Sequence, residues 1–404
     1  MSAESYPRVG ILADALGRWT GGIEFLRMCI SAMNAVSSGT VEDVYIPSRS
    51  IQKSIVRFGK NGMKALLRRS ITAWEPPSKS QLVDALTASR VQVGIAEFRE
   101  TRGSLARAMR ERHADVLFPC ESSLGTRFPV PWIGYLPDVQ HRQLPLMFSR
   151  RERWGRDKRI IRLLADAPAV VVNARSVKSD IERFYPNHGS RIVPLPFSPS
   201  SRFARDSVGS TQQLSEQYQL PHHYFMISNQ FWKHKSHGTA FMALRHLHDA
   251  GYKVHLVCTG ATCDTRWPEH FGALKDLINR LGIAEYIHIL GLIPKLDQLA
   301  IMQGSLALIQ PTLFEGAPGG GAVYDAVSLD VPSIVSDIPV NREIDIGFVR
   351  FFSAGSPEDL AEKLIDFLED PPQLPTETET ILRLQEREHK LGEVLLQTAR
   401  SIIV

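Results

Sequence analysis

The sequence contains little cysteine and no long run of apolar residues. Its four cysteines, Cys29, Cys120, Cys258 and Cys263, lack the spacing of metal ligands, and the last two do not form a CxxC motif. We expect reduced, partly buried thiols in a cytoplasmic protein. No stretch approaches the roughly eighteen apolar residues of a membrane-spanning helix. The first eight residues also lack the apolar core of a signal peptide.

Several catalytic patterns are missing as well. No Asp-x-Asp motif offers ligands to a divalent metal, and no further pair of carboxylates has the context of a glycosidase. No lysine has the context that anchors a pyridoxal group in a phosphorylase. We therefore expect no metal and no cofactor.

The composition is that of a folded protein with more than one core. A chain of 404 residues is too long for one ordinary core, so we expect two domains. Hydrophobic residues make up 43% and charged residues 22%, which excludes a disordered chain.

The net charge of +4 conceals two basic clusters, Arg49–Arg112 and Arg150–Arg162. Either these are solvated helix faces, or they form a surface for anionic partners. Such a partner would be the headgroups at the inner face of a membrane, contacted peripherally, or an acceptor that bears a diphosphate. We expect no nucleic acid, because no nucleic-acid-binding motif accompanies the charge.

Strand-like and helical segments alternate along the first half of the chain. A glycine-bearing loop is expected at Gly17–Gly22. The expected strands are 9–13, 44–46, 91–95, 116–119, 132–135, 169–172 and 192–194, and the expected helices are 23–36, 104–113, 175–184 and one from 149. This alternation predicts an open parallel sheet with helices on both faces.

The same rhythm starts again after a loop rich in Ser, Pro and Arg at 196–209. The expected strands are 224–227, 254–259, 287–290, 307–310 and 333–336, and the expected helices are 238–250, 272–281, 296–303, 321–329 and 377–401. We predict an α/β protein with two doubly wound, Rossmann-like domains that face each other across a cleft. The domains are 1–200 and 216–376, with a linker at 201–215. The last segment, 377–404, is a helix long enough to cross back to the first domain.

A glycine-rich segment, residues 311–339, carries the clearest chemistry. Gly319, Gly320 and Gly321 let the backbone approach a ligand, and the helix expected to begin near Ala322 favours a diphosphate at its N-terminus. Glu315 lies in what we expect to be an exposed loop. Glu315 and Asp325 suit paired hydroxyls of a sugar or ribose, because one carboxylate accepts two hydrogen bonds.

This segment resembles the donor-site signature of retaining GT-B glycosyltransferases of family 4, the glycosyl transferases group 1. In that signature two glutamates are separated by seven residues. Here Glu315 matches the first, and Asp325 takes the place of the second after nine intervening residues. Four other segments resemble the family in the same order: 20–26, 137–153, 171–186 and 288–316.

The resemblance implies which residues contact the donor. Gly21 and Gly22 approach the diphosphate from the first, acceptor-side domain. In the second, nucleotide-sugar-binding domain, Lys235 takes the position of a diphosphate-binding lysine. Gln230 stands where relatives have an arginine, so Lys233, or the pair His234 and His237, is expected to supply the missing charge.

The resemblance also implies an acceptor side and a reaction. Asp138, His141 and Arg142 fall where relatives face the acceptor and the transferred sugar, and we expect a catalytic role for Lys235, Glu315 and His141. The family implies a metal-independent, retaining transfer of a hexose or deoxyhexose from a nucleoside diphosphate sugar. The acceptor would be a saccharide or lipid-linked oligosaccharide, in bacterial polysaccharide biosynthesis.

Two other functions stay open at this point. The same architecture serves sugar-nucleotide epimerases, which would form product without an acceptor. The departures at Gln230 and Asp325 are also compatible with a non-catalytic or weakly active, donor-binding subunit of a glycosyltransferase complex. Donor binding without turnover would favour that second alternative.

Overall fold

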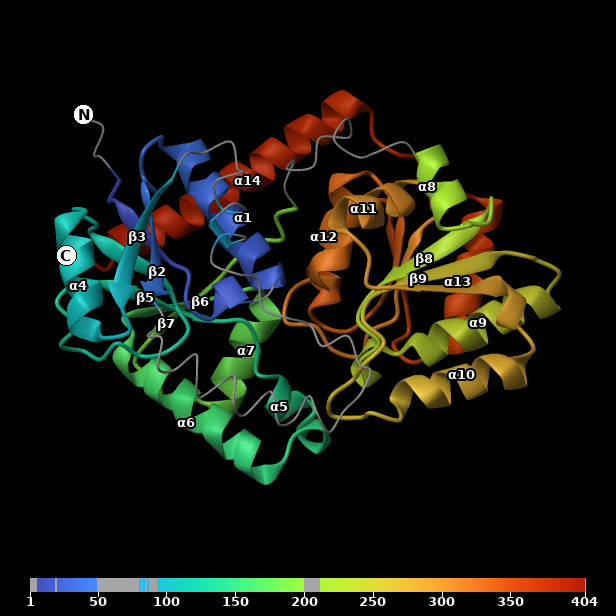
Figure 1. The fold of residues 1–404 in the computed structure, drawn as a ribbon, viewed down its shortest axis with the longest axis horizontal. Helices are drawn as coiled ribbons and strands as arrows, with labels where there is room; N and C mark the ends of the chain where they lie inside the picture. Colours follow the sequence, from blue (N-terminus) through green and yellow to red (C-terminus); the bar gives the residue numbers. More distant parts are fainter. Residues whose placement is uncertain are drawn as a thin grey trace.

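The structure is a computed structural model that describes residues 6–18, 20–48, 93–199 and 211–403, together with 80, 82, 83 and 86. Within these residues the chain forms two parallel sheets, each covered by helices on both faces (Figure 1). The part of the first basic cluster from Arg49 to Arg90 and the linker residues 201–210 lie outside the described residues. The predicted α/β architecture of two doubly wound domains is confirmed.

The first sheet has the strand order β3-β2-β1-β4-β5-β6-β7. Four of its strands are buried along their whole length, because helices cover both faces. The strands are β1 (Val9–Leu12), β2 (Asp43–Ser48), β3 (Gly94–Arg99), β4 (Val116–Cys120), β5 (Trp132–Leu136), β6 (Ala169–Val172) and β7 (Arg191–Pro194). The helices are η1 (Leu16–Arg18), α1 (Thr20–Val36), α4 (Arg102–Glu111), α5 (Gln140–Gln143), η2 (Pro145–Met147), α6 (Arg150–Asp166) and α7 (Arg175–Phe184).

The second sheet has the order β10-β9-β8-β11-β12-β13. Its strands are β8 (Tyr224–Ser228), β9 (His255–Thr259), β10 (Ile287–Gly291), β11 (Leu308–Gln310), β12 (Ser333–Ser336) and β13 (Val349–Phe352). The helices are α8 (Thr211–Gln217), η4 (Lys233–Lys235), α9 (His237–Asp249), α10 (His270–Leu281), η5 (Ala284–Tyr286), α11 (Lys295–Gln303), α12 (Gly320–Ser328), η6 (Asn341–Glu343), α13 (Pro357–Glu369) and α14 (Glu377–Arg400).

Each sheet has one point where the strand order reverses. The reversal falls between β1 and β4 in the first sheet and between β8 and β11 in the second. The loops that leave the carboxyl ends of the two strands diverge there and leave a crevice, which is where doubly wound sheets bind ligands. The segments after β8 and β11 are therefore the ones to examine.

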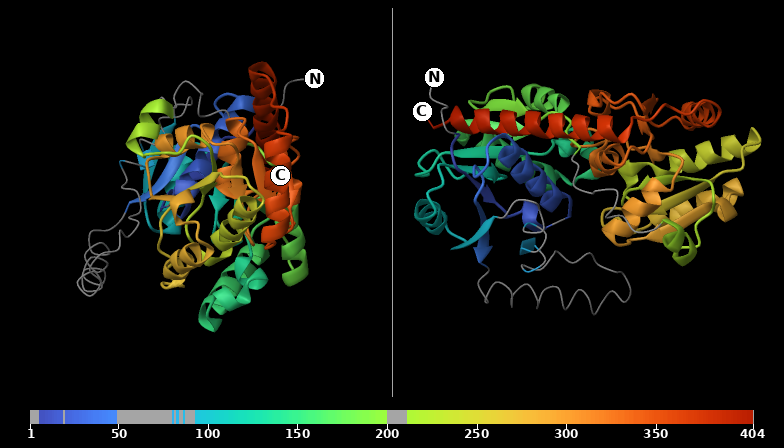
Figure 2. Two further views of the ribbon diagram at one scale, coloured as in Figure 1. Left: turned by 90° about the vertical axis from the view of Figure 1, so that its right-hand side faces the viewer. Right: turned by 90° about the horizontal axis from the view of Figure 1, so that it is seen from above.

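The long helix α14 joins the two domains (Figure 2). Its first half is held on the second domain, where Asp330 accepts hydrogen bonds from Thr380 Oγ1 at 2.7 Å and from Arg383 at 2.7 Å. Its second half lies along α1, and Leu391, Leu395 and Leu396 belong to the apolar core of the first domain. The second half of α14 therefore forms part of the same apolar core as β1 and α1.

A second contact joins the domains at α7. Ala174, at the start of this helix, provides no side-chain cap. Instead, the carboxylate of Glu343 from the second domain accepts hydrogen bonds from the backbone of Arg175 at 2.9 Å and of Ser176 at 2.7 Å. The favourable position of a carboxylate at a helix N-terminus stabilises this contact.

Two segments differ from the expectation. The loop expected at Gly17–Gly22 is instead η1 followed by α1, which begins at Thr20, so Gly21 and Gly22 lie in the first turn of a helix. Residues 211–215, expected in the linker, form part of α8. Tyr218, directly after α8, donates a hydrogen bond to Asp297 of α11 at 2.5 Å, so this segment packs as part of the second domain.

The packing of α14 on α1 depends on Gly392. A Cβ at this position would overlap the carbonyl group of Ala32 and lie 2.7 Å from Cγ2 of Val36. We expect Gly392→Ala to lower the free energy of unfolding by about 1–3 kcal/mol, because the backbone of α1 cannot move away without disturbing the core. Denaturant unfolding measures this change.

Gly155 provides the matched control. It lies inside α6, and a Cβ there would meet nothing within 4 Å. Gly155→Ala should be neutral or stabilise the protein by up to about 1 kcal/mol, as helix propensity predicts. Equal effects of the two substitutions would show that the close approach of α1 and α14 is not a constraint.

Candidate donor site in the cleft between the domains

Lys235 and Glu315 form an ion pair at the carboxyl ends of β8 and β11. Their side chains are only 11% and 10% exposed, and Gln310 donates a further hydrogen bond to Glu315 at 3.2 Å. The expectation that Glu315 lies in an exposed loop is therefore wrong, because its carboxylate is held inside the site. Lys235 is likewise not a solvated loop lysine.

A chain of hydrogen bonds links this pair to the neighbouring strand ends. Asn229, after β8, contacts Gln310 at the end of β11. Gln310 also donates to the carbonyl of Gly319 at 2.6 Å, and the amide of Gly319 donates to Asn341 at 2.7 Å. Asn341 in turn donates to the carbonyl of Ser336, at the end of β12, at 2.8 Å. The glycine-rich loop is thus fixed from both sides.

The glycines of this loop have distinct structural roles. Gly319 and Gly320 have φ of 69° and 62°, and a Cβ on Gly320 would lie 2.8 Å from Oε2 of Glu315. Only glycine fits this position without moving the carboxylate. Helix α12 begins at Gly320, earlier than the expected start near Ala322, so Gly320 and Gly321 belong to its first turn. Gly321 is exposed with open space beside it, which leaves room for a ligand at this helix N-terminus.

Asp325 lies in α12 and forms an ion pair with Lys295, the first residue of α11. Burial raises the pKa of Asp325 above its ordinary value, although Lys295 opposes the shift, and the negative charge of Glu24 in α1 adds to it. Because the charge of Glu24 acts on Asp325, the N-terminal part of α1 lies near α12. Sequence analysis missed Lys295, because a partner on another helix leaves no local signal.

The residues expected to replace the missing arginine are turned to other partners. The side-chain oxygen of Gln230 accepts a hydrogen bond from the amide of Ala261 at 2.8 Å. The Lys233 ammonium lies 3.9 Å from the ring centroid of Trp267, a cation–π contact. His234 and His237 are buried, and burial lowers the pKa of each to about 3. Both are neutral near pH 7, so the expectation that they supply positive charge is wrong.

Asp138 of the first domain, which was predicted to face the acceptor, lies close to the loop that follows β11. A Cβ on Gly316, next to Glu315, would lie 3.2 Å from Oδ2 of Asp138 and 3.0 Å from the carbonyl oxygen of Pro137. The other carboxylate oxygen of Asp138 accepts a hydrogen bond from the amide of Gln140 at 2.9 Å. Asp138 therefore packs directly against the loop that carries Glu315.

His141 and Arg142 instead meet Asp157 on α6. Nε2 of His141 lies 2.9 Å from Asp157 and 3.1 Å from the hydroxyl of Tyr185, and Arg142 binds both oxygens of Asp157. Burial lowers the pKa of His141, and the hydrogen bond to Asp157 opposes this effect. With Nε2–H donated to Asp157, Nδ1 is left as a buried acceptor without a partner among the described residues. The arrangement anchors α5 to α6.

Sequence analysis also missed an aromatic contact that spans the cleft. The Arg156 guanidinium lies 4.6 Å from the ring centroid of Phe148, and that of Arg266, from the second domain, lies 4.5 Å from the same ring. Burial lowers the pKa of Arg156, and the nearby Asp138 opposes this shift. Arg156 therefore adds positive charge near Asp138, and Arg266 lies against the same phenylalanine ring as Arg156. Arg156 belonged to a recognised basic cluster, but nothing in its sequence context distinguished it from its exposed neighbours.

Two features are absent from the described part of the chain. No helix there combines the length and apolarity needed to cross a bilayer. No group of three or more His, Cys, Asp or Glu side chains within the described ranges is arranged to hold a metal ion.

Comparison with known proteins supports the predicted family. Residues 212–386 match the family described as glycosyl transferases group 1. The second domain is a group 1 glycosyltransferase domain. No curated protein sequence matches the chain.

The similarity to solved structures extends over both domains of the chain. HepE (Alr3699) of Anabaena, solved in complex with UDP and glucose, is 12% identical with a TM-score of 0.60, over 98% of this chain and 99% of that one. A glycosyltransferase of Rickettsia africae ESF-5 is 15% identical with a TM-score of 0.57, over 98% and 97%. WaaG, a glycosyltransferase involved in lipopolysaccharide biosynthesis, is 14% identical with a TM-score of 0.55, over 98% and 99%. The chain has the GT-B fold.

The neutral, buried state of His237 predicts a pH-dependent stability. Its pKa is about 3 in the folded protein and about 6.5 when unfolded, so below pH 6.5 the unfolded chain binds more protons. The free energy of unfolding should therefore fall by about 1.4 kcal/mol per pH unit for each such histidine as the pH drops below 6.5. Unfolding titrations at several pH values between 7 and about 5 measure this slope.

The ring of His237 stacks on Phe231, with 4.1 Å between the ring centroids, and a phenylalanine ring could take the same place. His237→Phe should therefore remove the contribution of one histidine to the pH dependence of the free energy of unfolding, because phenylalanine does not titrate. His222→Phe, at an exposed position, is the control and should leave the slope unchanged. A His237→Phe variant with the wild-type slope would contradict the prediction.

Proposed function

We propose that this protein is a retaining glycosyltransferase that moves a hexose or deoxyhexose from a nucleoside diphosphate sugar to a saccharide or lipid-linked oligosaccharide. One observation carries the proposal. The Lys235–Glu315 pair lies beside the glycine-rich start of α12, and Asp138 of the first domain packs against Gly316, next to Glu315. This places a cation, a helix N-terminus and carboxylates from two domains around one space.

The donor would be bound by groups of complementary charge. The Lys235 ammonium and the amides at the start of α12 suit a diphosphate, and the first turn of α1, with Gly21 and Gly22, approaches from the other side. Glu315 suits two hydroxyls of the transferred sugar, because a carboxylate accepts paired hydrogen bonds. Asp325 lies further along α12 and pairs with Lys295 of α11. Its carboxylate would suit the hydroxyls of the ribose that adjoins the diphosphate.

The chemistry that these residues supply is mainly electrostatic. Negative charge on the leaving diphosphate grows as the glycosidic bond breaks, and fixed cations stabilise it in the transition state. Lys235 is the nearest such cation, and Arg156 and Arg266 add to the potential of the cleft. The acceptor hydroxyl attacks from the face on which the diphosphate departs, and its proton leaves with that group. No enzyme nucleophile and no metal ion are required in this scheme.

The acceptor is the least constrained part of the proposal. Involvement in bacterial polysaccharide biosynthesis is supported by the likeness to WaaG and by the fold. A cytoplasmic protein with peripheral contact to an anionic membrane is supported by α6, on which Trp154 is 65% exposed and Ile161 55% exposed among arginines and lysines. Side chains of this mixture suit the interface of a bilayer.

A second candidate function is a donor-binding subunit with little or no activity. Two observations favour it: Gln230 replaces a guanidinium and is occupied by Ala261, and Asp325 is paired with Lys295. Such a subunit would bind the donor without releasing nucleoside diphosphate. We prefer the active enzyme, because Lys235, Glu315 and the start of α12 are all in place.

The first test is a screen of UDP, GDP, dTDP and ADP sugars with saccharide acceptors. We expect one donor to stabilise the protein thermally and to be turned over, with a product whose anomeric configuration, read by NMR, equals that of the donor. Activity should persist in excess EDTA. An inverted product would contradict retention, and activity lost with EDTA and restored by magnesium or manganese would contradict metal independence. Donor binding without turnover would favour the donor-binding subunit. Product formed without an added acceptor would favour an epimerase.

The second test concerns the charge of Lys235. Lys235→Gln should lower kcat by about 10²–10³ with a smaller change in KM, because the charge matters most in the transition state. A single substitution also leaves Glu315 buried without its partner, which is itself destabilising. The double variant Lys235→Gln/Glu315→Gln removes both charges, so it should regain thermal stability and still lack activity.

Lys233→Gln is the matched control for this experiment. It removes a lysine two residues away that contacts Trp267, and its kcat should stay near the wild-type value. A stable double variant with normal kcat would refute the role of the pair. If only Lys233→Gln lowers kcat, the cation that stabilises the leaving diphosphate is Lys233 and not Lys235.

A further inference from the structure

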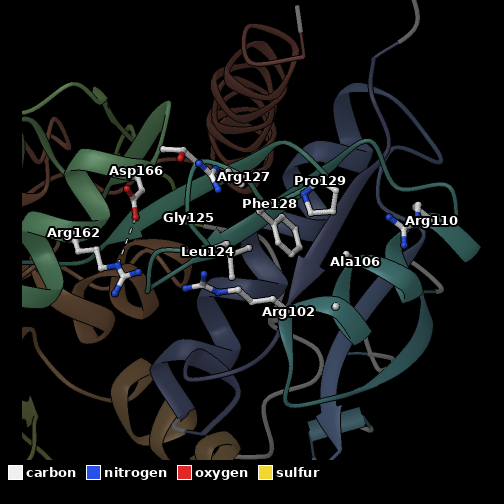
Figure 3. A pocket seen from close by; sticks show the side chains of 12 residues that line it. Arg102, Ala106, Arg110, Leu124, Gly125, Arg127, Phe128, Pro129, Arg162 and Asp166 are labelled. Atoms are coloured by element: carbon white, nitrogen blue, oxygen red, sulfur yellow. Dashed lines mark ion pairs between the residues drawn. The ribbon is translucent and has the colours of Figure 1, made fainter.

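A cavity of about 470 Å³ opens on the first domain between α4 and α6 (Figure 3). It exists because the connection from β4 to β5, residues 121–131, contains no helix. The layer of helices that covers this face of the sheet is therefore interrupted, and the loop leaves a hollow beside α4 and α6. Its volume is in the range of small-molecule sites.

Four arginines from three different segments line this cavity. Arg102 and Arg110 come from α4, Arg127 from the loop, and Arg162 from α6. Asp166 is the one acidic residue among the lining residues, so the cavity carries an excess of three positive charges. Asp166 is already engaged, since it contacts the hydroxyl of Ser123 and lies 3.7 Å from Arg162.

Three of the four arginines, Arg102, Arg110 and Arg127, form no ion pair with a carboxylate of the described residues, whereas Arg162 pairs with Asp166. Arg102 donates a hydrogen bond to the carbonyl of Ser123 at 3.1 Å, which positions its guanidinium but leaves its charge. Among the residues that the structure describes, no ion pair joins Arg110 or Arg127 to a carboxylate. An anion that entered the cavity would therefore meet positive charge that no neighbouring carboxylate in the described part of the chain compensates.

The floor of the cavity is apolar. Leu124, Phe128 and Ala106 lie between the arginines, as Figure 3 shows. Walls of low polarity strengthen the field of the charges around them. The first turn of α4, with Arg102 and Gly103, also borders the cavity, and the partial positive charge of a helix N-terminus adds to the field. Guanidinium groups match the geometry of phosphate oxygens better than any other side chain.

We propose that this cavity binds a phosphate-bearing ligand at a site separate from the donor cleft. Arg162 lies twelve residues beyond Arg150, the start of α6 beside the cleft, which corresponds to about 18 Å along the helix axis. The phosphate belongs either to a free phosphorylated saccharide or to a lipid headgroup. The site does not depend on the proposed glycosyl transfer.

The test uses the full chain and inorganic pyrophosphate as the soluble probe. All variants carry Lys235→Gln/Glu315→Gln, which removes the buried ion pair of the donor cleft without leaving one charge unpaired, and the remaining binding is measured by calorimetry. Adding Arg110→Gln and Arg127→Gln should weaken pyrophosphate binding at least about tenfold, because two charge-assisted contacts are lost. Both side chains are exposed, so the fold should be retained, and circular dichroism checks this.

Lys275→Gln with Arg280→Gln is the matched control, since it removes the same charge from exposed positions of α10 in the second domain. It should bind pyrophosphate like its parent. The proposal is overturned if the cavity variant binds as tightly as its parent, or if the control is weakened equally. A failure of the donor screen would leave these results unaffected.

Vesicles identify the source of the phosphate. Co-sedimentation is compared for phosphatidylcholine vesicles with and without phosphatidylglycerol. If the cavity variant loses binding to the anionic vesicles and the control does not, the ligand is a lipid headgroup. If only pyrophosphate binding is lost, the ligand is a free phosphorylated molecule.

Discussion

The geometry of the cleft depends on the near-burial of two opposite charges, Lys235 and Glu315. Neither charge could be removed from water without the other, because the desolvation of an unpaired ion costs several kcal/mol. The pair therefore draws the loop after β8 onto the loop after β11. Gln310 extends this link to the glycine-rich turn, and Asn341 extends it to β12. Three strand ends are held as one surface before any substrate is considered.

Residues of the first domain contact the second domain near this surface. Asp138 lies against Gly316, Phe148 lies near two arginines, one from each domain, and Glu343 supports the first turn of α7. All three contacts involve charged groups, and charged contacts are more easily exchanged with water than an apolar interface. Interfaces of this kind permit one domain to move relative to the other. The polar character of the contacts is thus consistent with a cleft that opens and closes.

Much of the fold could be predicted from the sequence, because apolar runs and caps are local signals. The strand Ser333–Ser336 and the start of α14 at Glu377 agree with the expectation to the residue. The first turn of α1 was missed because Gly21 and Gly22 disfavour a helix, and only packing fixes it there. In the site, the glycine run was predicted from the sequence, and Lys235 was predicted from the family resemblance. The burial of Glu315, the neutral state of His237 and the roles of Lys295 and Arg156 depend on partners distant in sequence, and no local pattern reports them.

The path of α14 has a consequence for modular exchange between related enzymes. A hybrid could join the first domain of one parent to the second domain of another within the linker. Such a junction would bring α14 from the second parent onto α1 of the first parent, where Gly392 must meet the backbone of Ala32. A viable hybrid would need a second junction near the middle of α14, after Arg387, so that Leu391, Leu395 and Leu396 stay with the core that they complete.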